Sequence, residues 1–167
     1  MPPVYSNTIV KMDSSTTSRK GLRDIAELLI DSRKGYEEAA QRVEAPHLKQ
    51  LLSRLGTERF PLIIEVESQL RMLGEDDVPK DGTLKGSLHR TWIDIRDSLT
   101  GSENANVLDE CERGEKYLLG RYDDMMNDSE IAPGVRSVLS TQRTKIQSNI
   151  TEIQALHATH EASEKNK

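Results

Sequence analysis

The sequence has a single cysteine, few aromatic residues and almost none of the alternation that marks a β-sheet. Cys111 has no second cysteine to pair with, so an intramolecular disulfide is excluded and nothing requires an oxidising compartment. Aromatic residues make up only 4% of the chain, and runs of alternating β-branched and polar residues are nearly absent. These shortages disfavour an all-β fold.

Long apolar runs and an excess of basic charge are missing too. No apolar stretch approaches the ~20 residues that a helix needs to cross a bilayer, and residues 1–20 lack the apolar region of a signal peptide. The net charge is -5, whereas binding to phosphates needs a concentrated basic surface. We therefore expect a cytoplasmic protein that binds neither membranes nor nucleic acid.

Helical periodicity is what the sequence has in abundance. Apolar residues recur at steps of three or four along four long segments, which places them on one face of each predicted helix. The predicted inward residues are Leu22, Ile25, Leu29, Tyr36, Ala40 and Val43; Leu48, Leu51, Leu55, Leu62, Val66, Leu70 and Leu73; Leu108, Cys111, Leu118, Tyr122 and Met125; and Val135, Val138, Leu139, Ile146, Ile150, Ile153 and His157. A further helix is predicted over residues 83–99.

Two Ala-Pro turns belong to an internal repeat. Ala45-Pro46 and Ala132-Pro133 each end one helix and start the next, because proline is disfavoured inside a helix but fits its first turn. An offset of 87 residues relates the two turns, and it also carries Glu65 onto Glu152. Each repeat unit is thus a helical hairpin, whose apolar face is buried only when two hairpins pack together.

The predicted fold is all-α: a ferritin-like, antiparallel four-helix bundle made of two hairpins, with a long crossover (75–103) that carries an additional helix. The bundle spans residues 21–158, between a flexible N-terminal segment (1–20) and a flexible C-terminal tail (159–167), both of polar composition. Gly74 is predicted to end the second helix. Pro61, inside that helix, predicts a kink or bulge.

Three further motifs are not explained by periodicity. They are GYEEAA at 35–40, GSLHRTWID at 86–94 and ECERGE at 110–115, and the Leu-His-Arg-x-Trp part of the second is the most specific. With these motifs, the stretch from Leu22 to Leu156 resembles a bacterial family of ferritin-like proteins known mainly as a domain of unknown function. The resemblance implies the fold and a stress-related or uncharacterised bacterial setting, without an established reaction.

Glutamates on the predicted helices raise the possibility of a metal site. Di-iron sites in such bundles use carboxylates from two helices and a Glu-x-x-His pair from each of the other two. The candidate ligands are Glu65, Glu112, Glu115 and Glu152, with iron or manganese as the metal. Ser68 and Ala155 stand where the two histidines would be, so neither Glu-x-x-His pair is present.

The resemblance points to two more missing ligands. Where the family commonly has a carboxylate on the first helix and a histidine on the last, this chain has Arg33 and Ile150. We therefore expect a polar layer in which Arg33 is the salt-bridge partner of the carboxylates, and no cofactor. His157 and His160 could form a surface metal site, although a solvated helix end is the favoured interpretation. Cys111 is expected to be a buried hydrophobic residue.

Two functions stay open. The first is a non-catalytic helical-bundle protein that self-associates, as a dimer, through the amphipathic crossover helix. The alternative is a ferritin-like protein that binds or oxidises iron at a carboxylate-rich site. The incomplete ligand set favours the first, and no catalytic triad or phosphate-binding loop suggests another enzyme.

Overall fold

The computed structural model describes residues 5–80 and 104–167, and within them the chain forms long helices and no strand. The helices are α1 (Tyr5–Arg42), α2 (Pro46–Met72), α4 (Asn104–Met126) and α5 (Pro133–Lys165). The predicted all-α helical bundle is thereby confirmed. The helix predicted at 83–99 and the Leu-His-Arg-x-Trp motif lie outside the described residues.

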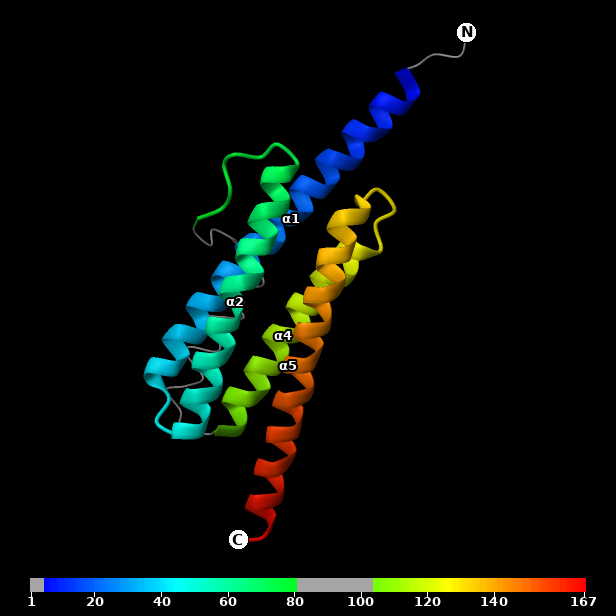
Figure 1. Cartoon of the computed structure of the whole chain (residues 1–167). Coiled ribbons are helices and arrows are strands. Elements are labelled where there is room, and N and C mark those ends of the chain that lie inside the picture. The colour runs from blue at the N-terminus through cyan, green and yellow to red at the C-terminus, as the bar shows by residue number, and fades with distance from the viewer. Residues whose placement is uncertain (1–4, 81–103) are drawn as a thin grey trace.

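The four helices form two antiparallel hairpins that lie side by side (Figure 1). α1 packs chiefly against α2, and α4 chiefly against α5, while weaker contacts join α1 to α4 and α2 to α5. α2 ends at the end of the bundle opposite to the one where α4 begins, so α2 and α4 run in the same direction (Figure 1).

The two Ala-Pro turns have the same backbone geometry, as the internal repeat predicts. Ala45 (φ -64°, ψ 119°) and Ala132 (φ -60°, ψ 139°) are both extended, the conformation that a following proline favours. In each turn the alanine carbonyl accepts the first hydrogen bond of the new helix, from Lys49 N–H and from Arg136 N–H, both at 3.0 Å. The repeat is therefore a repeat of structure.

The end of α2 also follows the prediction. Gly74 has a positive φ of 86°, a conformation that glycine adopts without steric penalty. The Glu75 N–H donates to the Leu70 carbonyl at 3.0 Å and the Gly74 N–H to that of Arg71 at 3.0 Å. These two bonds form a Schellman motif, which satisfies carbonyl groups left free by the helix end.

The core lies along the inward stripes of all four helices. Nearly all of the predicted inward residues are buried, and the exceptions, Leu73, Val138 and His157, are partly buried at the margins. Residues that the prediction did not include extend the core: Ala26, Leu28, Ile30, Ala39, Leu52, Ile63, Val78, Val107 and Ile131. Helical spacing therefore located the core correctly and underestimated its width.

Two predicted helix ends are wrong. α1 begins at Tyr5, well before the predicted start at Gly21, and α5 continues through the expected tail to Lys165. Ser18, in the segment expected to be flexible, is buried, and its hydroxyl accepts a hydrogen bond from the Ala132 N–H at 3.2 Å. The serine-rich composition of this segment predicted flexibility and gave no sign of the contact between Ser18 and Ala132.

The bulge predicted at Pro61 is not found, whereas the alternative, a kink of the helix axis, stays a prediction. α2 is α-helical without a break from Pro46 to Met72. The proline lacks the N–H that would bond the Thr57 carbonyl one turn earlier. Because Pro61 and Thr57 are both exposed, water can satisfy that carbonyl, and the helix continues.

Candidate functional site

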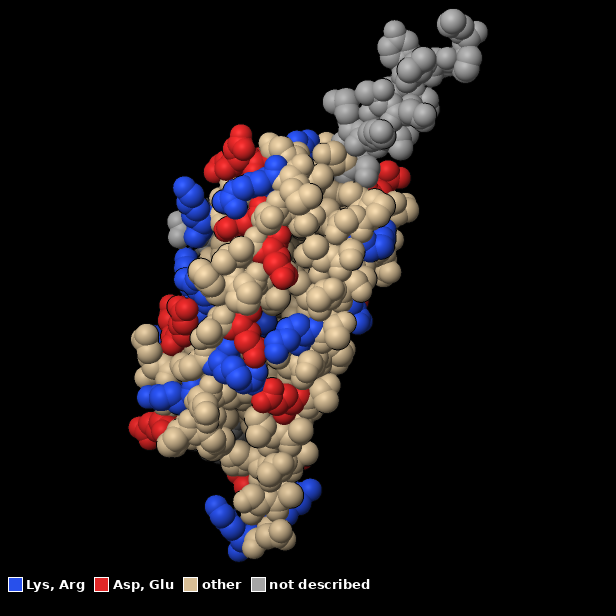
Figure 2. Space-filling model, in the orientation of Figure 1, with Lys and Arg blue, Asp and Glu red and all other residues tan. Residues whose placement is uncertain are grey.

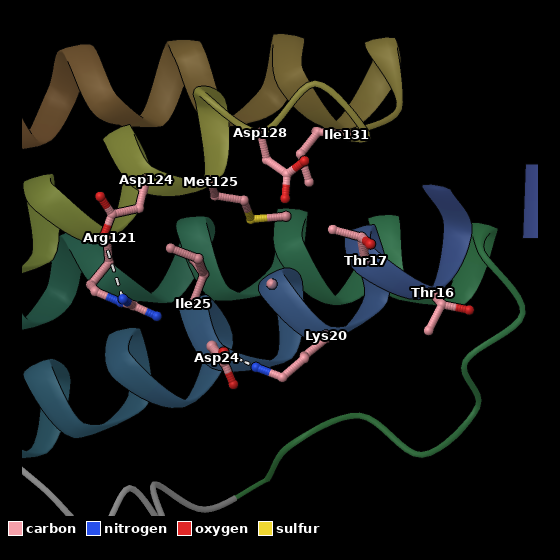
Figure 3. Close-up of a pocket in the computed structure, with 11 residues that line it drawn as sticks. Thr16, Thr17, Lys20, Asp24, Ile25, Arg121, Asp124, Met125, Asp128 and Ile131 are labelled. Carbon is pink, nitrogen blue, oxygen red and sulfur yellow. Dashed lines mark hydrogen bonds and ion pairs between the residues drawn. The ribbon is translucent and has the colours of Figure 1, made fainter. Parts of the chain in front are cut away.

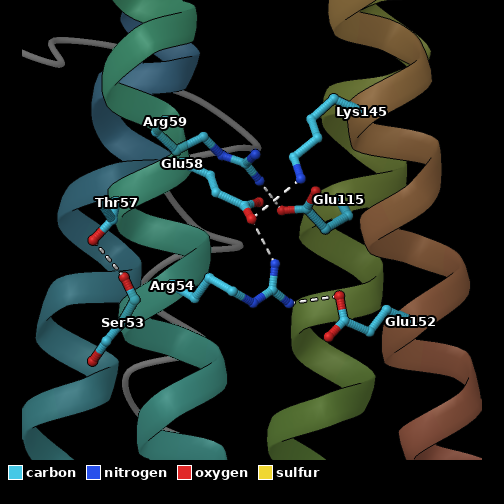
Figure 4. Close-up of polar contacts among 8 residues, drawn as sticks. All are labelled: Ser53, Arg54, Thr57, Glu58, Arg59, Glu115, Lys145 and Glu152. Atoms are coloured by element: carbon cyan, nitrogen blue, oxygen red, sulfur yellow. Dashed lines mark hydrogen bonds and ion pairs between the residues drawn. The ribbon is translucent and has the colours of Figure 1, made fainter.

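A buried ion pair between Arg59 and Glu115 lies at the centre of the bundle. Arg59 is 0% exposed and occupies the inward stripe of α2 between Leu55 and Leu62, while Glu115 is 1% exposed on the inward stripe of α4. The Arg59 guanidinium donates through Nη2 to Glu115 Oε1 (Figure 4). Because α2 and α4 belong to different hairpins, this ion pair connects the two repeat units.

Two side chains of α1 complete the site. Tyr36 donates its hydroxyl to the same Glu115 Oε1 at 2.5 Å, and Ser32 Oγ accepts from Arg59 Nε at 2.8 Å. The guanidinium also lies 5.5 Å from the centroid of the Tyr36 ring, within the range of a cation–π contact. A serine, a tyrosine, an arginine and a glutamate from three helices thus form one buried hydrogen-bonded cluster, which we call the Arg59–Glu115 cluster.

The protonation states in this cluster follow from its surroundings. Burial raises the pKa of Tyr36 well above its ordinary value, and the nearby Glu115 carboxylate raises it further, so the phenol stays neutral and acts as a donor. Burial by itself lowers the pKa of Arg59, but the electrostatic effects of Glu115 and, to a smaller extent, of Tyr36, Tyr122 and Glu58 together outweigh it, and the net pKa is raised. The Arg59 guanidinium is therefore a fixed positive charge, and the Tyr36 phenol is not suited to exchanging protons near neutral pH.

A second buried contact lies next to the Arg59–Glu115 cluster and joins α4, α5 and α2. The Tyr122 hydroxyl donates to Gln142 Oε1 at 2.7 Å. The Gln142 amide then donates to the Leu62 carbonyl at 3.1 Å and to Glu65 Oε2 at 2.7 Å. Burial raises the pKa of Tyr122 as well, with Glu115 and Glu65 adding to the rise against the opposing charge of Arg59. The Tyr122 hydroxyl and the Gln142 amide therefore form these hydrogen bonds with other groups of the protein.

An ion-pair network on the surface runs beside the buried cluster (Figure 4). Arg54 of α2 donates to Glu58 at 2.6 Å and to Glu152 of α5 at 2.5 Å, and Lys145 of α5 lies 3.2 Å from Glu58. Burial raises the pKa of Glu58, but hydrogen bonds from Arg54 and Lys145 outweigh it and the net pKa is lowered. Figure 2 shows the same mixture on the face it draws, where acidic and basic side chains alternate.

The structure does not bring the four predicted metal ligands together. Only Glu115 is buried; Glu65 and Glu152 are exposed and Glu112 is partly buried. Each has its own polar partner: Gln142 for Glu65, Lys116 and Gln154 for Glu112, Arg59 and Tyr36 for Glu115, and Arg54 for Glu152. Among residues 15–80 and 106–167, no three His, Cys, Asp or Glu side chains lie close enough to hold a metal ion.

The predicted role of Arg33 is wrong. Its guanidinium lies 3.3 Å from Glu37 on the same helix and 5.8 Å from the Phe60 ring centroid. Arg59 makes the buried salt bridge instead. The sequence did contain a signal for it, because Arg59 follows Leu55 by four residues and precedes Leu62 by three, which is the spacing of the inward stripe.

The remaining candidates are single residues. Cys111 is fully buried, and burial together with the charges of Glu115 and Glu110 raises the pKa of its thiol, which makes it unreactive. His157 lies in helix α5, where its Nε2 is 2.9 Å from Asp109 Oδ1 of α4. This contact agrees with the predicted place of His157 on the inward stripe of the last helix.

Comparison with known proteins yields one match. The family model described as "Domain of unknown function (DUF2383)" matches residues 17–128, a span that contains Ser32, Tyr36, Arg59 and Glu115. No curated protein and no solved structure matches the chain. None of the helices in the described part of the chain contains an apolar stretch long enough to cross a membrane. Because the family model covers more than half of the sequence, the chain belongs to the DUF2383 family.

Proposed function

We propose that this chain is a non-catalytic, ferritin-like helical-bundle protein whose working properties are stability and self-association. The observation that carries the proposal is the Arg59–Glu115 ion pair. Ferritin-like bundles bind metal between their four helices with carboxylates and histidines. Here a guanidinium supplies positive charge at the centre of the bundle, and the carboxylate beside it is already neutralised.

The ferritin-like assignment rests on topology. A bundle in which two antiparallel hairpins are joined by one long crossover has its second and third bundle helices parallel. The parallel course of α2 and α4 in Figure 1 agrees with this arrangement. The family carries no assigned reaction, and the stress-related setting implied by the resemblance is part of the proposal.

Self-association is supported by the surface of α2. The exposed large hydrophobic side chains in the described part of the chain are Phe60, Ile64 and Met72, which are 54%, 48% and 76% exposed and all belong to this helix. Phe60 and Ile64 are four residues apart and therefore lie on one face. Two copies related by a twofold axis would each bury this face against the other.

We expect the purified protein to dimerise as its concentration rises, and Ile64→Lys to weaken the dimer at least tenfold, because burying an isoleucine contributes about 1.5–3 kcal/mol. Sedimentation equilibrium over a wide concentration range measures both. Ser148→Lys, at an exposed position of α5 in the other hairpin, is the matched control and should associate as the wild type does. A wild-type protein that stays monomeric at every concentration would refute self-association through this face.

An alternative function is iron or manganese binding at a carboxylate-rich site. One observation favours it: Glu115 Oε2 is buried and has no hydrogen-bond partner among the described residues. That oxygen belongs to a carboxylate in the core and could take a cation. Rapid oxygen consumption on addition of ferrous iron, abolished by Glu115→Gln, would favour this alternative over a non-catalytic bundle.

A further inference from the structure

A cavity of about 350 Å³ opens between the N-terminal half of α1 and the α4–α5 turn (Figure 3). Its floor is apolar and is formed by the buried side chains of Ile25, Met125 and Ile131. Gly21 keeps the floor open, since a Cβ atom there would lie 2.7 Å from both Sδ and Cε of Met125. Any larger residue would push the end of Met125 into the cavity.

The rim of the cavity is charged. Lys20 pairs with Asp24 at 3.4 Å on the α1 side, and Arg121 pairs with Asp124 at 3.3 Å on the α4 side (Figure 3). The fifth charged group, Asp128, has no ionic partner in the described part of the chain. Its Oδ1 accepts only the Glu130 N–H, at 2.9 Å.

The position of Asp128 suits a cation. The residue follows the C-terminus of α4, where the helix dipole contributes partial negative charge. Figure 3 shows its carboxylate directed toward α1, with Met125 and Thr17 beside it. Arg136 donates to the carbonyl oxygens of Met126 and Asp128. It leaves the Asp128 carboxylate itself without a counter-charge.

From this combination we infer that the cavity binds a small amphipathic amine, whose apolar part covers the floor while its ammonium group pairs with Asp128. An apolar floor with one unpaired carboxylate at its edge distinguishes such a ligand from a neutral or an anionic one of the same shape. The carboxylate forms a charge-assisted hydrogen bond with an ammonium, and repels a carboxylate ligand. This inference is independent of the proposed function.

The test uses hexylamine, hexan-1-ol and hexanoate as matched probes, titrated into the full-length protein and followed by the NMR signals of the Met125 methyl group and the Gly21 and Ile131 amides. We expect saturable shifts with hexylamine, affinity about tenfold lower for hexan-1-ol, and the weakest binding for hexanoate, because one charge-assisted hydrogen bond is lost or reversed. Equal affinities for the amine and the alcohol, or no saturable shift with the amine, would overturn the inference.

Two variants and a control assign the contacts. Asp128→Asn should lower the affinity for hexylamine to that for hexan-1-ol and leave the alcohol unchanged, since an asparagine Oδ1 can still accept the Glu130 N–H. Gly21→Ala should weaken the binding of both probes by displacing Met125 into the cavity. Gly120→Ala, where an added Cβ has no neighbour within 4 Å, should bind as the wild type does. An Asp128→Asn variant with unchanged affinity for the amine would contradict the assignment.

Discussion

Replacing Glu115 with leucine should lower the free energy of unfolding by about 3–5 kcal/mol, because Arg59 would remain charged and buried without its counter-ion. Arg59 is fully buried, so no small movement can return it to water. Arg59→Met should be destabilising for the reciprocal reason, leaving Glu115 buried beside Tyr36. Urea denaturation followed by circular dichroism measures both changes.

The double variant Arg59→Met/Glu115→Leu should recover most of the stability that either single variant loses. Replacing both members of a buried ion pair with apolar residues of similar size removes the need to desolvate two charges, and is often neutral or stabilising. Tyr36 would lose its acceptor, so adding Tyr36→Phe should improve the recovery further.

The surface pair Arg54 and Glu152 is the matched control, because it spans the same two hairpins at an exposed site. Arg54→Met and Glu152→Leu should each change stability by no more than about 1 kcal/mol. If Glu115→Leu proved as mild as Glu152→Leu, the buried pair would not hold the hairpins together in the way described.

Replacing Gly56 with leucine should also be strongly destabilising, by about 3 kcal/mol or more, because it forces α1 and α2 apart. A Cβ atom at Gly56 would already lie 3.3 Å from the Tyr36 Cβ and 3.6 Å from the Arg33 carbonyl oxygen. Separating the helices would draw Tyr36 away from Arg59 and Glu115. The loss would therefore combine overpacking with damage to the Arg59–Glu115 cluster.

Gly56→Ala separates these two effects. Alanine gains about 1 kcal/mol of helix propensity over glycine, and the contact at 3.3 Å requires a shift of only a few tenths of an ångström. We expect its stability to stay within about 1 kcal/mol of the wild type. Gly120→Leu, at an open position of α4, should be stabilising. A Gly56→Leu protein as stable as Gly120→Leu would show that the helices do not approach closely here.

The sequence predicted the frame of this protein well, because the frame depends on local rules. The Ala-Pro turns, the Gly74 helix end and the inward stripes follow from proline geometry, positive φ and helical spacing. These features need no knowledge of what packs against them. The failure at the first helix has the opposite property: the partner of Ser18 is Ala132, 114 residues away in the sequence.

The candidate site was predicted in part. Glu115 was named as a candidate ligand and was expected to have an arginine as its salt-bridge partner, and the structure pairs it with Arg59. Arg33 was named through the family resemblance, whereas the partner is Arg59, whose place on the inward stripe of α2 directs it toward Glu115. Glu65 and Glu152 were selected by the repeat, yet equivalence within a repeat does not place a side chain in the core.

Metal analysis of untagged protein, after equilibration with ferrous iron and with manganese and removal of free ions, tests the central claim most directly. That claim is that Arg59 neutralises Glu115 and so leaves no cation site at the centre of the bundle. We predict a metal content far below one ion per chain, unchanged by Glu115→Gln. A near-stoichiometric content of iron or manganese that is lost in Glu115→Gln would contradict the claim and establish a metal site at Glu115.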